Sequence, residues 1–372
     1  MGWLELDGAL RELTARGAVP AASLCVRLRG KTVFDGAYGV PNPETGAAAT
    51  VRTRYDLASV SKLFAATAFF RLCEQGVFSL EEPVCKSFPE FTGPRDIRAS
   101  ANALAPGDDT LRGTAEASLI TWRQVLVHNA GFGWFALNSF PSPQAALDHL
   151  LHRPLAYRPG TEVLYTDLGL ILLGRAMELR CEKPLDVLVR ELVCAPLGLE
   201  DTGYFRVSHG AVTQDVAPTE YCAWRGCRMH GLVHDENAYF LDGVAGHAGV
   251  FSTARDVAAF AQAWLDAWRG GGLVPRETAR ALTAFQQQNT WDRRAVAFQL
   301  RIIDRDAHSF PLSRTTFGHT GFTGTCMWVD PERELCFALL TNDVYGGREN
   351  RTMGRERKAI VERIIEAVDS SL

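Results

Sequence analysis

Residues 55–67 read YDLASVSKLFAAT and change abruptly from a polar run to an apolar one. Within the second half, side chains recur at helical spacing, at Val60, Leu63, Phe64 and Thr67. The apolar run continues to Leu72, and Gly76 then stops it. This pattern predicts a buried helix that begins at or just after Ser59.

Ser59 and Lys62 stand three residues apart at the start of this predicted helix. Free backbone N–H groups and the positive end of the helix dipole favour a developing anion there. Lys62 shares the face of Ser59 at roughly 5–6 Å between Cβ atoms, so the pair can form a nucleophile and its base. Taken alone, the four residues favour a simpler interpretation, a serine that caps a helix and a solvated lysine. Ser61 is a poorer nucleophile, because it points to another side of the helix.

Length and composition are those of an ordinary globular enzyme. The 372 residues are enough for about two domains with sizeable cores. Hydrophobic residues make up 47% of the chain and charged residues 22%. The net charge is −4 and the isoelectric point is near 6.2, so we expect no nucleic-acid partner and no anionic membrane partner.

The compartment is predicted from what the sequence lacks. Residues 1–7, MGWLELD, contain neither the basic nor the apolar region of a secretory signal. We find no apolar run long enough to span a bilayer. The nine cysteines show no paired spacing, and their odd number leaves at least one unpaired. We therefore expect a cytoplasmic protein, or an exported one if a signal sequence has been removed.

Strand-rich blocks lie at both ends of the chain. An amphipathic helix with Trp3, Leu6, Leu10 and Leu13 on one side precedes a predicted hairpin of strands 22–29 and 32–38. Later in the chain we predict strands over 295–303, 325–329 and 335–340, and a closing helix over 351–368. The two blocks together predict one α/β domain built from both termini.

The middle of the chain is rich in helices and poor in strands. Short helices are predicted over 121–127, 144–151 and 185–193. The Pro, Gly and Asp content of 84–118 predicts an irregular insertion. The predicted domains are therefore 1–75 with 285–372, which form the sheet domain, and 76–284, which form a mainly helical domain.

A second candidate for chemistry is the segment 158–167, RPGTEVLYTD, which runs extended into a helix that begins near Leu168. Tyr165 could place a phenol at an interdomain cleft, and Asp167 could project the same way. A phenolate beside an ammonium can act as a general base, because opposite charge lowers its pKa. The simpler alternatives are a core or boundary tyrosine and an Asp167 side chain that only caps the helix.

A third candidate is the segment 317–325, FGHTGFTGT, in which three glycines alternate with hydroxyl side chains. Glycine is unfavourable in a strand unless the backbone must closely approach another group. Backbone N–H groups at such a strand edge could supply half of an oxyanion hole. A β-bulge or glycines that pack within the sheet would be the simpler explanation.

Together the three segments resemble a known constellation. Ser59-Val60-Ser61-Lys62, Tyr165-Thr166-Asp167 and His319-Thr320-Gly321 resemble, in this order, the S-x-x-K, Y-x-N and K-T-G or H-T-G motifs of the serine β-lactamase and penicillin-binding-protein superfamily. The chain is similar in particular to the class C β-lactamase-like serine hydrolases, in their esterase-like branch. Segments 126–131, 158–160, 246–256 and 328–331 are also similar to the family, and the resemblance spans about residues 20–345.

The resemblance implies an α+β fold of the β-lactamase/transpeptidase type, an antiparallel sheet flanked by helices plus a mostly helical domain, with the site in the cleft between them. It implies that Ser59 attacks a carbonyl and forms an acyl-enzyme, while Lys62 and Tyr165 share the proton transfer. The backbone N–H groups of Ser59 and Phe322 would form the oxyanion hole. The positions implied to bind substrate are Asp167, His319, Thr320 and Gly321.

Two residues depart from the family pattern. Asp167 replaces an amide that donates a hydrogen bond to substrate, and an ionised carboxylate can only accept one. His319 replaces a lysine, which leaves less fixed positive charge near neutral pH. Both changes favour an esterase, or a peptidase of unusual specificity, over an efficient β-lactamase.

We expect no metal and no cofactor. The polar residues His234, Asp235, Glu236, Asn237 and His247 match no H-E-x-x-H spacing, so a loop network that lines the cleft is the preferred interpretation. Cys222 and Cys227 lack a second pair that would complete a zinc site. A phosphate loop, a dinucleotide fingerprint and a G-x-S-x-G elbow are all missing from the sequence.

The expected function is therefore that of a serine hydrolase that cleaves a small ester or amide, with an esterase as the first choice. A D-amino-acid peptidase, a D-Ala-D-Ala carboxypeptidase or a weak β-lactamase is the alternative within the enzymes. From a different class, the chain could be a penicillin-binding sensor module that is acylated and turns over poorly. The expected partner is a small-molecule substrate.

Overall fold

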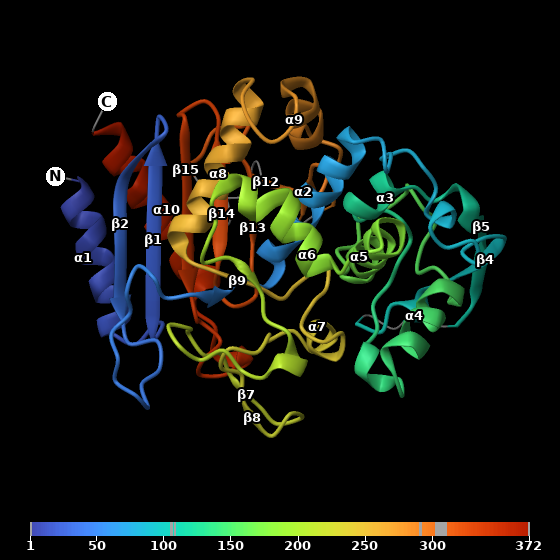
Figure 1. Cartoon of the computed structure of the whole chain (residues 1–372), viewed down its shortest axis with the longest axis horizontal. Helices are drawn as coiled ribbons and strands as arrows, with labels where there is room; N and C mark the ends of the chain where they lie inside the picture. Colours follow the sequence, from blue (N-terminus) through green and yellow to red (C-terminus); the bar gives the residue numbers. More distant parts are fainter. Residues whose placement is uncertain (1, 105–106, 108, 290–291, 302–310, 371–372) are drawn as a thin grey trace.

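The computed structural model describes residues 2–370 except 105–106, 108, 290–291 and 302–310. Its main element is an eight-stranded antiparallel sheet with the strand order β10-β11-β12-β13-β14-β15-β1-β2 (Figure 1). The strands are β1 Ala21–Leu28, β2 Lys31–Gly39, β10 Gln287–Gln288, β11 Arg293–Arg294, β12 Gln299–Leu300, β13 Phe317–Thr320, β14 Cys326–Asp330 and β15 Leu335–Thr341. β1 pairs with β15, with Ala22 opposite Thr341, so both ends of the chain build one sheet, as the sequence pattern predicts.

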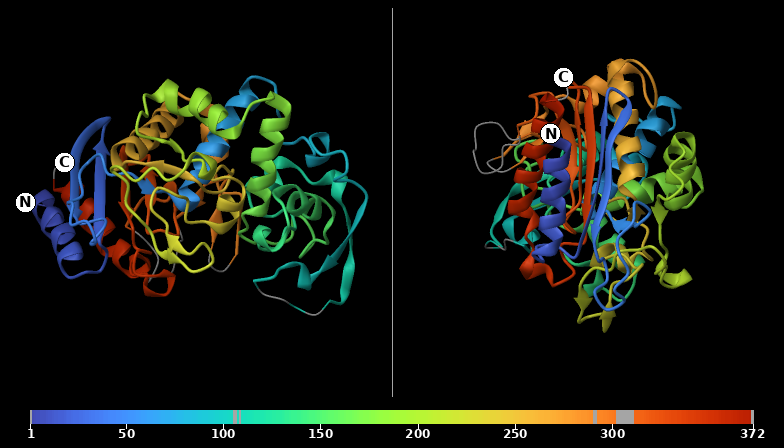
Figure 2. Two further views of the ribbon diagram at one scale, coloured as in Figure 1. Left: turned by 60° about the horizontal axis from the view of Figure 1, so that its bottom comes forward. Right: turned by 90° about the vertical axis from the view of Figure 1, so that its left-hand side faces the viewer.

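Both faces of this sheet are covered by helices. α1, Gly2–Ala15, and α10, Met353–Asp369, lie on one face, and α8, Ala254–Arg269, lies on the other (Figure 2, right). Alternate residues of β15 serve the two layers: Phe337 belongs to the cluster under α1 and α10, and Ala338 to the cluster under α8. Each large apolar side chain buried in this way contributes about 1.5–3 kcal/mol. The arrangement confirms the predicted α+β fold.

Most of the remaining helices gather on the other side of the molecule, around α5, whereas α9, Arg276–Thr283, packs on α8 (Figure 1). Those around α5 are α2 Ser61–Glu74, α3 Trp122–Leu126, α4 Pro143–His152, α5 itself, Leu168–Cys181, α6 Leu185–Val189 and α7 Glu236–Phe240. Three small sheets complete the fold: β3 Tyr55–Asp56 with β9 Val250–Ser252 and β6 Gly203–Tyr204; β4 Pro94–Arg98 with β5 Leu111–Glu116; and β7 Tyr221–Cys222 with β8 Cys227–Arg228.

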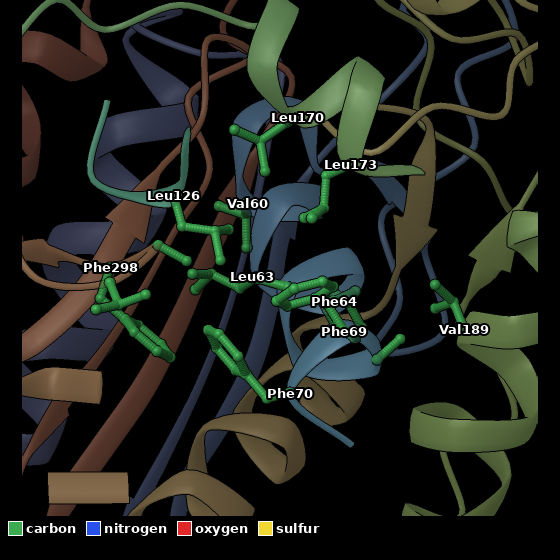
Figure 3. Packing of buried hydrophobic residues seen from close by; sticks show 14 of the residues in the cluster. Val60, Leu63, Phe64, Phe69, Phe70, Leu126, Leu170, Leu173, Val189 and Phe298 are labelled. Atoms are coloured by element: carbon green, nitrogen blue, oxygen red, sulfur yellow. The ribbon is translucent and has the colours of Figure 1, made fainter. Parts of the chain in front are cut away.

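α2 is the buried helix that the 55–67 pattern predicts. Its side chains from Ser61 to Phe70 are all buried, and Leu63, Phe64 and Phe69 pack among side chains from several helices (Figure 3). Phe64 stacks on Phe260 of α8 with ring centroids 4.2 Å apart. α2 therefore connects the helical part to the helix that covers the sheet, which gives Ser59, just before α2, a rigid support.

Some predicted elements differ from the structure. Of the described part of the predicted strand 295–303, only β12, Gln299–Leu300, is a strand. Residues 295–298 form the turn of a tight hairpin between β11 and β12, where Ala297 has a φ of +69°, and residues 302–303 lie outside the described residues. The insertion 84–118 is not wholly irregular, since β4 and β5 form a hairpin within it. A helix over 254–269 was not predicted, although Val257, Phe260 and Trp264 follow helical spacing.

The position of α8 bears on the predicted domain boundaries. The boundaries 76–284 assign α8 to the helical domain, whereas α8 packs on β1, β14 and β15. The packing groups α8 with the sheet, and the division into two domains stays a prediction. Among the described residues, no helix has the length and apolarity that crossing a membrane would require.

Candidate active site

Ser59 lies in a single 3-10 turn, Ala58–Val60, directly before α2. Ala58 has a φ of +46°, a left-handed conformation that residues other than glycine rarely adopt. The buried Asp56 carboxylate holds this turn, because it accepts the Ala58 N–H at 2.8 Å and the backbone N–H of His234 at 2.7 Å. Strained backbone of this kind is frequent at functional sites, where the surrounding structure holds it in place.

Lys62 is one turn beyond Ser59 and is buried, with 2% of its side chain exposed. Its Nζ lies 2.9 Å from Ser59 Oγ, 2.7 Å from Asp167 Oδ1 and 3.3 Å from the His247 carbonyl oxygen. Burial alone would lower the pKa of Lys62, but the charges of Asp167 and Tyr165 and the hydrogen bonds to both together outweigh burial, so the pKa is raised. Lys62 is buried and paired with an acid, and the alternative of a solvated lysine is wrong.

Tyr165 also contacts the Ser59 side-chain oxygen. Its hydroxyl donates a hydrogen bond to Ser59 Oγ at 2.7 Å. Two cations face its ring: Lys62 Nζ is 4.8 Å and the Arg294 guanidinium carbon 4.7 Å from the ring centroid. The structure thus brings Ser59, Lys62 and Tyr165 together around one oxygen atom, while their catalytic roles stay predictions.

Asp167 occupies the N-cap position of α5, but its side chain caps nothing. The Thr166 hydroxyl accepts the Leu168 N–H at 3.3 Å instead. The alternative that Asp167 serves only as a helix cap is therefore wrong. Its carboxylate, 19% exposed, pairs with Lys62, a contact that motif spacing does not predict.

His319 and Thr320 end strand β13, and Gly321 follows directly. A Cβ atom at Gly321 would lie 2.1 Å from Thr325 Oγ1 and 2.5 Å from the carbonyl oxygen of Leu57. Only glycine fits there, which confirms the predicted close approach of the backbone. At Gly318, in contrast, a Cβ would meet the neighbouring strand, so that glycine serves sheet packing.

His319 is a buried, neutral ring. Its Nδ1 lies 2.7 Å from the Thr320 carbonyl oxygen, and its Nε2 lies 2.9 Å from Arg294 Nη1. Because a guanidinium can only donate, Nε2 accepts and Nδ1 carries the proton. Burial and the charge of Arg294 hold the pKa of His319 well below its usual range.

Arg294 is the site residue that sequence reasoning missed. Its guanidinium is 4% exposed and lies between Asp292, at 2.6 Å, and His319. The fixed positive charge that His319 itself lacks is therefore supplied by a residue from β11. A single arginine in a short hairpin carries no signal in the sequence that would place it against His319.

Two hollows meet at Ser59, Tyr165 and Phe322. The arginine hollow, about 540 Å³, is lined among others by Arg294, Arg351 and Arg357, together with Thr320 and Gly321. The acidic hollow, about 550 Å³, is lined among others by Asp167, Asp235 and Glu236, together with Leu104 and Trp134. Of the predicted substrate-binding residues, Asp167, Thr320 and Gly321 line a hollow, whereas His319 is not among the described residues that do.

Phe322 was expected to contribute a backbone N–H to the oxyanion hole. Its side chain is 38% exposed, and it lines both hollows beside Ser59. The Arg351 guanidinium lies 3.8 Å from its ring centroid. The segment thus borders the site on the side where the oxyanion is expected, and the donor role stays a prediction.

The cluster around His247 forms a loop network along the acidic hollow, as expected. His247 Nε2 lies 2.8 Å from Asp235 Oδ1, which also accepts the Ala238 N–H at 2.8 Å. Among the described residues, Asp167, Asp235 and His247 form one group whose ligand-type atoms lie within 4.8 Å of one another. The Lys62 ammonium already contacts Asp167 there and would repel a divalent ion, so this donor set does not fit a metal.

Comparisons with known proteins place the chain in a family. A family model described as Beta-lactamase matches residues 6–362. N-acetylmuramyl-L-alanine amidase from Bacillus subtilis (strain 168) is 31% identical over 361 residues, which cover 87% of this chain and 77% of that protein.

Two solved structures share the fold. The hydrolase EstCE1, described as having promiscuous acyltransferase activity, superposes with a TM-score of 0.74 at 20% identity and covers 98% of both chains. The D-amino acid amidase from Ochrobactrum anthropi SV3 superposes with a TM-score of 0.73 at 20% identity, again over 98% of both chains. At this level of identity the two structures show the fold alone.

Proposed function

Because this chain belongs to the beta-lactamase family of serine hydrolases, we propose that it cleaves a small ester or amide through an acyl-enzyme on Ser59, and acts mainly as an esterase. One observation carries the proposal: Lys62 Nζ and the Tyr165 hydroxyl both contact Ser59 Oγ, at 2.9 Å and 2.7 Å. A serine held between two proton-transfer groups can lose its proton as it attacks.

The proposed reaction has two halves. Ser59 Oγ bonds to the substrate carbonyl carbon while its proton passes to the Lys62–Tyr165 pair. The resulting oxyanion accepts hydrogen bonds from the backbone N–H groups of Ser59 and Phe322, worth about 3–4 kcal/mol for each donor. The leaving group departs with the proton, and water then repeats these steps to release the acid and restore Ser59.

The preference for esters rests on Asp167. An amide at this position would offer an N–H to a carbonyl of the substrate, whereas the Asp167 carboxylate offers none and is paired with Lys62. A substrate whose acyl group carries amides therefore gains no hydrogen bond from this residue. A simple acyl ester has no amide carbonyl in its acyl group, so it does not need the hydrogen bond that Asp167 fails to donate.

A peptide-like amide substrate is the second candidate, and the arginine hollow favours it. Arg294, Arg351 and Arg357 outnumber the acids that line the same hollow, Asp292 and Asp343. This excess of positive charge suits a leaving group that carries a carboxylate, such as an amino acid. The amidases named above, one related in sequence and one alike in fold, agree with this candidate.

The test compares turnover with covalent labelling. The protein is incubated with p-nitrophenyl acyl esters, with D-amino acid amides and D-Ala-D-Ala peptides, and with a β-lactam, and each reaction is followed by product release and intact mass. Fast ester turnover without β-lactam loss supports the esterase, and preferred cleavage of the peptides supports the second candidate. A lasting mass adduct without turnover would instead identify a sensor module.

Ser59→Ala is the decisive variant for the proposed nucleophile. We expect it to lose at least about 10³-fold in kcat/KM and to show no acyl adduct by mass. Ser61→Ala is the matched control, because Ser61 is two residues away and its hydroxyl accepts the Val250 N–H rather than contacting Lys62. If Ser59→Ala hydrolyses the ester as fast as the wild type, the assignment is wrong.

The cytoplasmic location predicted from the N-terminal sequence stays a prediction. Fractionation of cells that express the full-length gene, followed by detection of the protein with an antibody, tests it.

A further inference from the structure

We propose that Asp167, through its ion pair with Lys62, is the positioning residue that makes Tyr165 rather than Lys62 the base that deprotonates Ser59. The inference rests on the proposed acyl-enzyme function and assigns the proton transfer within it. It also gives Asp167 a role different from the substrate contact that its motif position implies.

The contacts of Lys62 support this assignment. The oxygen nearest to Nζ is that of the Asp167 carboxylate, at 2.7 Å, and Nζ also contacts Ser59 Oγ, the His247 carbonyl oxygen and the Tyr165 side chain. An ammonium has three N–H donors and no lone pair, so it suits a site in which every neighbour can accept a hydrogen bond. A neutral amine would leave the partly buried Asp167 charge unpaired, because Lys62 is its ion-pair partner within the described part of the chain.

Charges from every neighbouring element act on Lys62. Asp167 and Tyr165, which precede α5, favour the charged amine, and Asp235, before α7, interacts with it as well. His128 and His319 also face Lys62, but burial lowers the pKa of both rings well below the usual range, so neither adds a positive charge near neutral pH. The Arg294 guanidinium faces the Tyr165 ring, 4.7 Å from its centroid. The acidic neighbours of Lys62 therefore decide whether its amine is charged.

The proton path follows from this charge. A Lys62 ammonium can donate to Ser59 Oγ but cannot accept the Ser59 proton. The Tyr165 oxygen, 2.7 Å from Ser59 Oγ, is the remaining acceptor when it is a phenolate. The Ser59 proton then passes to Tyr165 as Oγ bonds to the carbonyl carbon, and Tyr165 returns it to the leaving group. Lys62 and Arg294, which lie 4.8 Å and 4.7 Å from the ring centroid, stabilise the phenolate charge.

The charge of Lys62 can be measured without any turnover. The chain has five lysines, Lys31, Lys62, Lys86, Lys183 and Lys358, so ¹⁵N-lysine labelling gives few Nζ signals, and Lys62→Met identifies the relevant one. We expect the wild-type Lys62 signal to remain that of an ammonium from pH 6 to above pH 10. In Asp167→Asn the burial remains and the counter-charge is gone, so this signal should convert to a neutral amine at lower pH.

Kinetics supply the second readout. In the wild-type background, Tyr165→Phe removes the base, and we expect kcat/KM for an ester to fall by about 10²–10⁴-fold. In the Asp167→Asn background a neutral Lys62 can accept the proton. Tyr165→Phe should therefore lower kcat/KM by less than about tenfold in that background. Asp186→Asn is the matched control, since it removes a similarly buried carboxylate that pairs with Arg206 and not with Lys62.

Several results would overturn the assignment. A neutral Lys62 in the wild type at pH 7 contradicts it directly, and this measurement needs no variant of Asp167 to fold. An equal loss for Tyr165→Phe in both backgrounds, or a Lys62 titration unchanged by Asp167→Asn, contradicts it as well. Failure of the hydrolase function itself would appear separately, as ester turnover that survives Ser59→Ala.

Discussion

At the residue scale, the charges around Ser59 are buried in pairs. Lys62 lies 2.7 Å from Asp167, and Arg294 lies 2.6 Å from Asp292. Loss of one partner from a buried pair leaves the other uncompensated, which costs more than the pair itself contributes. Substitutions at these positions should therefore be made with isosteric amides, so that charge and packing are not removed together.

The two buried histidines give a pH dependence of stability. Burial, followed by the charge of Arg294, holds the pKa of His128 and His319 well below 6.5, whereas the unfolded chain protonates both near that value. Their contribution to the free energy of unfolding is fully present above pH 6.5 and is lost as the pH falls below it. The loss for both rings is up to about 2.7 kcal/mol per pH unit.

Urea unfolding between pH 5 and pH 7 measures this slope. His319→Gln should reduce the slope by up to half of that amount, because one fewer ring then takes up a proton on unfolding. His209→Gln, at an exposed position, is the matched control and should leave the slope unchanged. A slope in His319→Gln equal to that of the wild type would show that His319 is not held neutral.

At the scale of elements, the 84–118 insertion reaches the site. Leu104 lines the acidic hollow although 67% of the residue is exposed, and the Ala103 N–H donates to the Trp134 carbonyl oxygen at 2.9 Å. Leu104 and Trp134 thus place apolar surface opposite the acidic residues. The composition of the insertion indicates turns, but it gives no information on which part of the molecule the turns approach.

This apolar surface predicts an effect on chain-length preference. Leu104→Asp should lower kcat/KM for a p-nitrophenyl hexanoate more than for the acetate, because only the longer acyl chain can cover Leu104. We expect the ratio of kcat/KM for the hexanoate to kcat/KM for the acetate to fall by about 5- to 30-fold, the equivalent of one to two kcal/mol. Steady-state kinetics with both esters measure it.

Leu119→Asp provides the comparison, since Leu119 is 72% exposed and is not among the residues described along the acidic hollow. If the ratio of kcat/KM for the hexanoate to kcat/KM for the acetate is the same in Leu104→Asp and Leu119→Asp, the acyl chain does not occupy this hollow.

At the scale of the whole molecule, the two ends of the chain lie side by side. α1 and α10 pack on the same face of the sheet, and a Cβ atom at Gly2 would lie 2.6 Å from Ala367 Cα. Figures 1 and 2 show the marked termini on the same side of the molecule. The two ends of this chain can therefore be joined by a short linker without disturbing the sheet.

A circular permutant tests this arrangement. With the ends joined by about six glycine and serine residues, which span roughly 13 Å, new termini in the exposed stretch 208–214 should leave a cooperative thermal transition and ester turnover. A permutant opened between Phe64 and Ala65, inside buried α2, should not fold. Circular dichroism and ester kinetics distinguish the two, and failure of the first permutant would contradict the proximity of the ends.

The features that the sequence by itself determined are those encoded within short stretches. Periodicity determines the buried helix after Ser59 and the strands at both ends. Spacing places Lys62 one turn above Ser59, and three short motifs point to the family. Each signal depends only on neighbours along the chain, and the resemblance of the three motifs to one family joins them, which is why the fold class could be predicted and why Ser59, Lys62 and Tyr165 could be named as candidates whose catalytic roles stay predictions.

Only the tertiary structure decided which distant side chains share a contact. Asp167 turned out to be the partner of Lys62, and Arg294 reached His319 from a strand 25 residues earlier in the chain. The hairpin at Ala297, which replaced a predicted strand, is what brings Arg294 to that position. Such contacts depend on how whole elements pack against one another, and no local pattern of residue types records that packing.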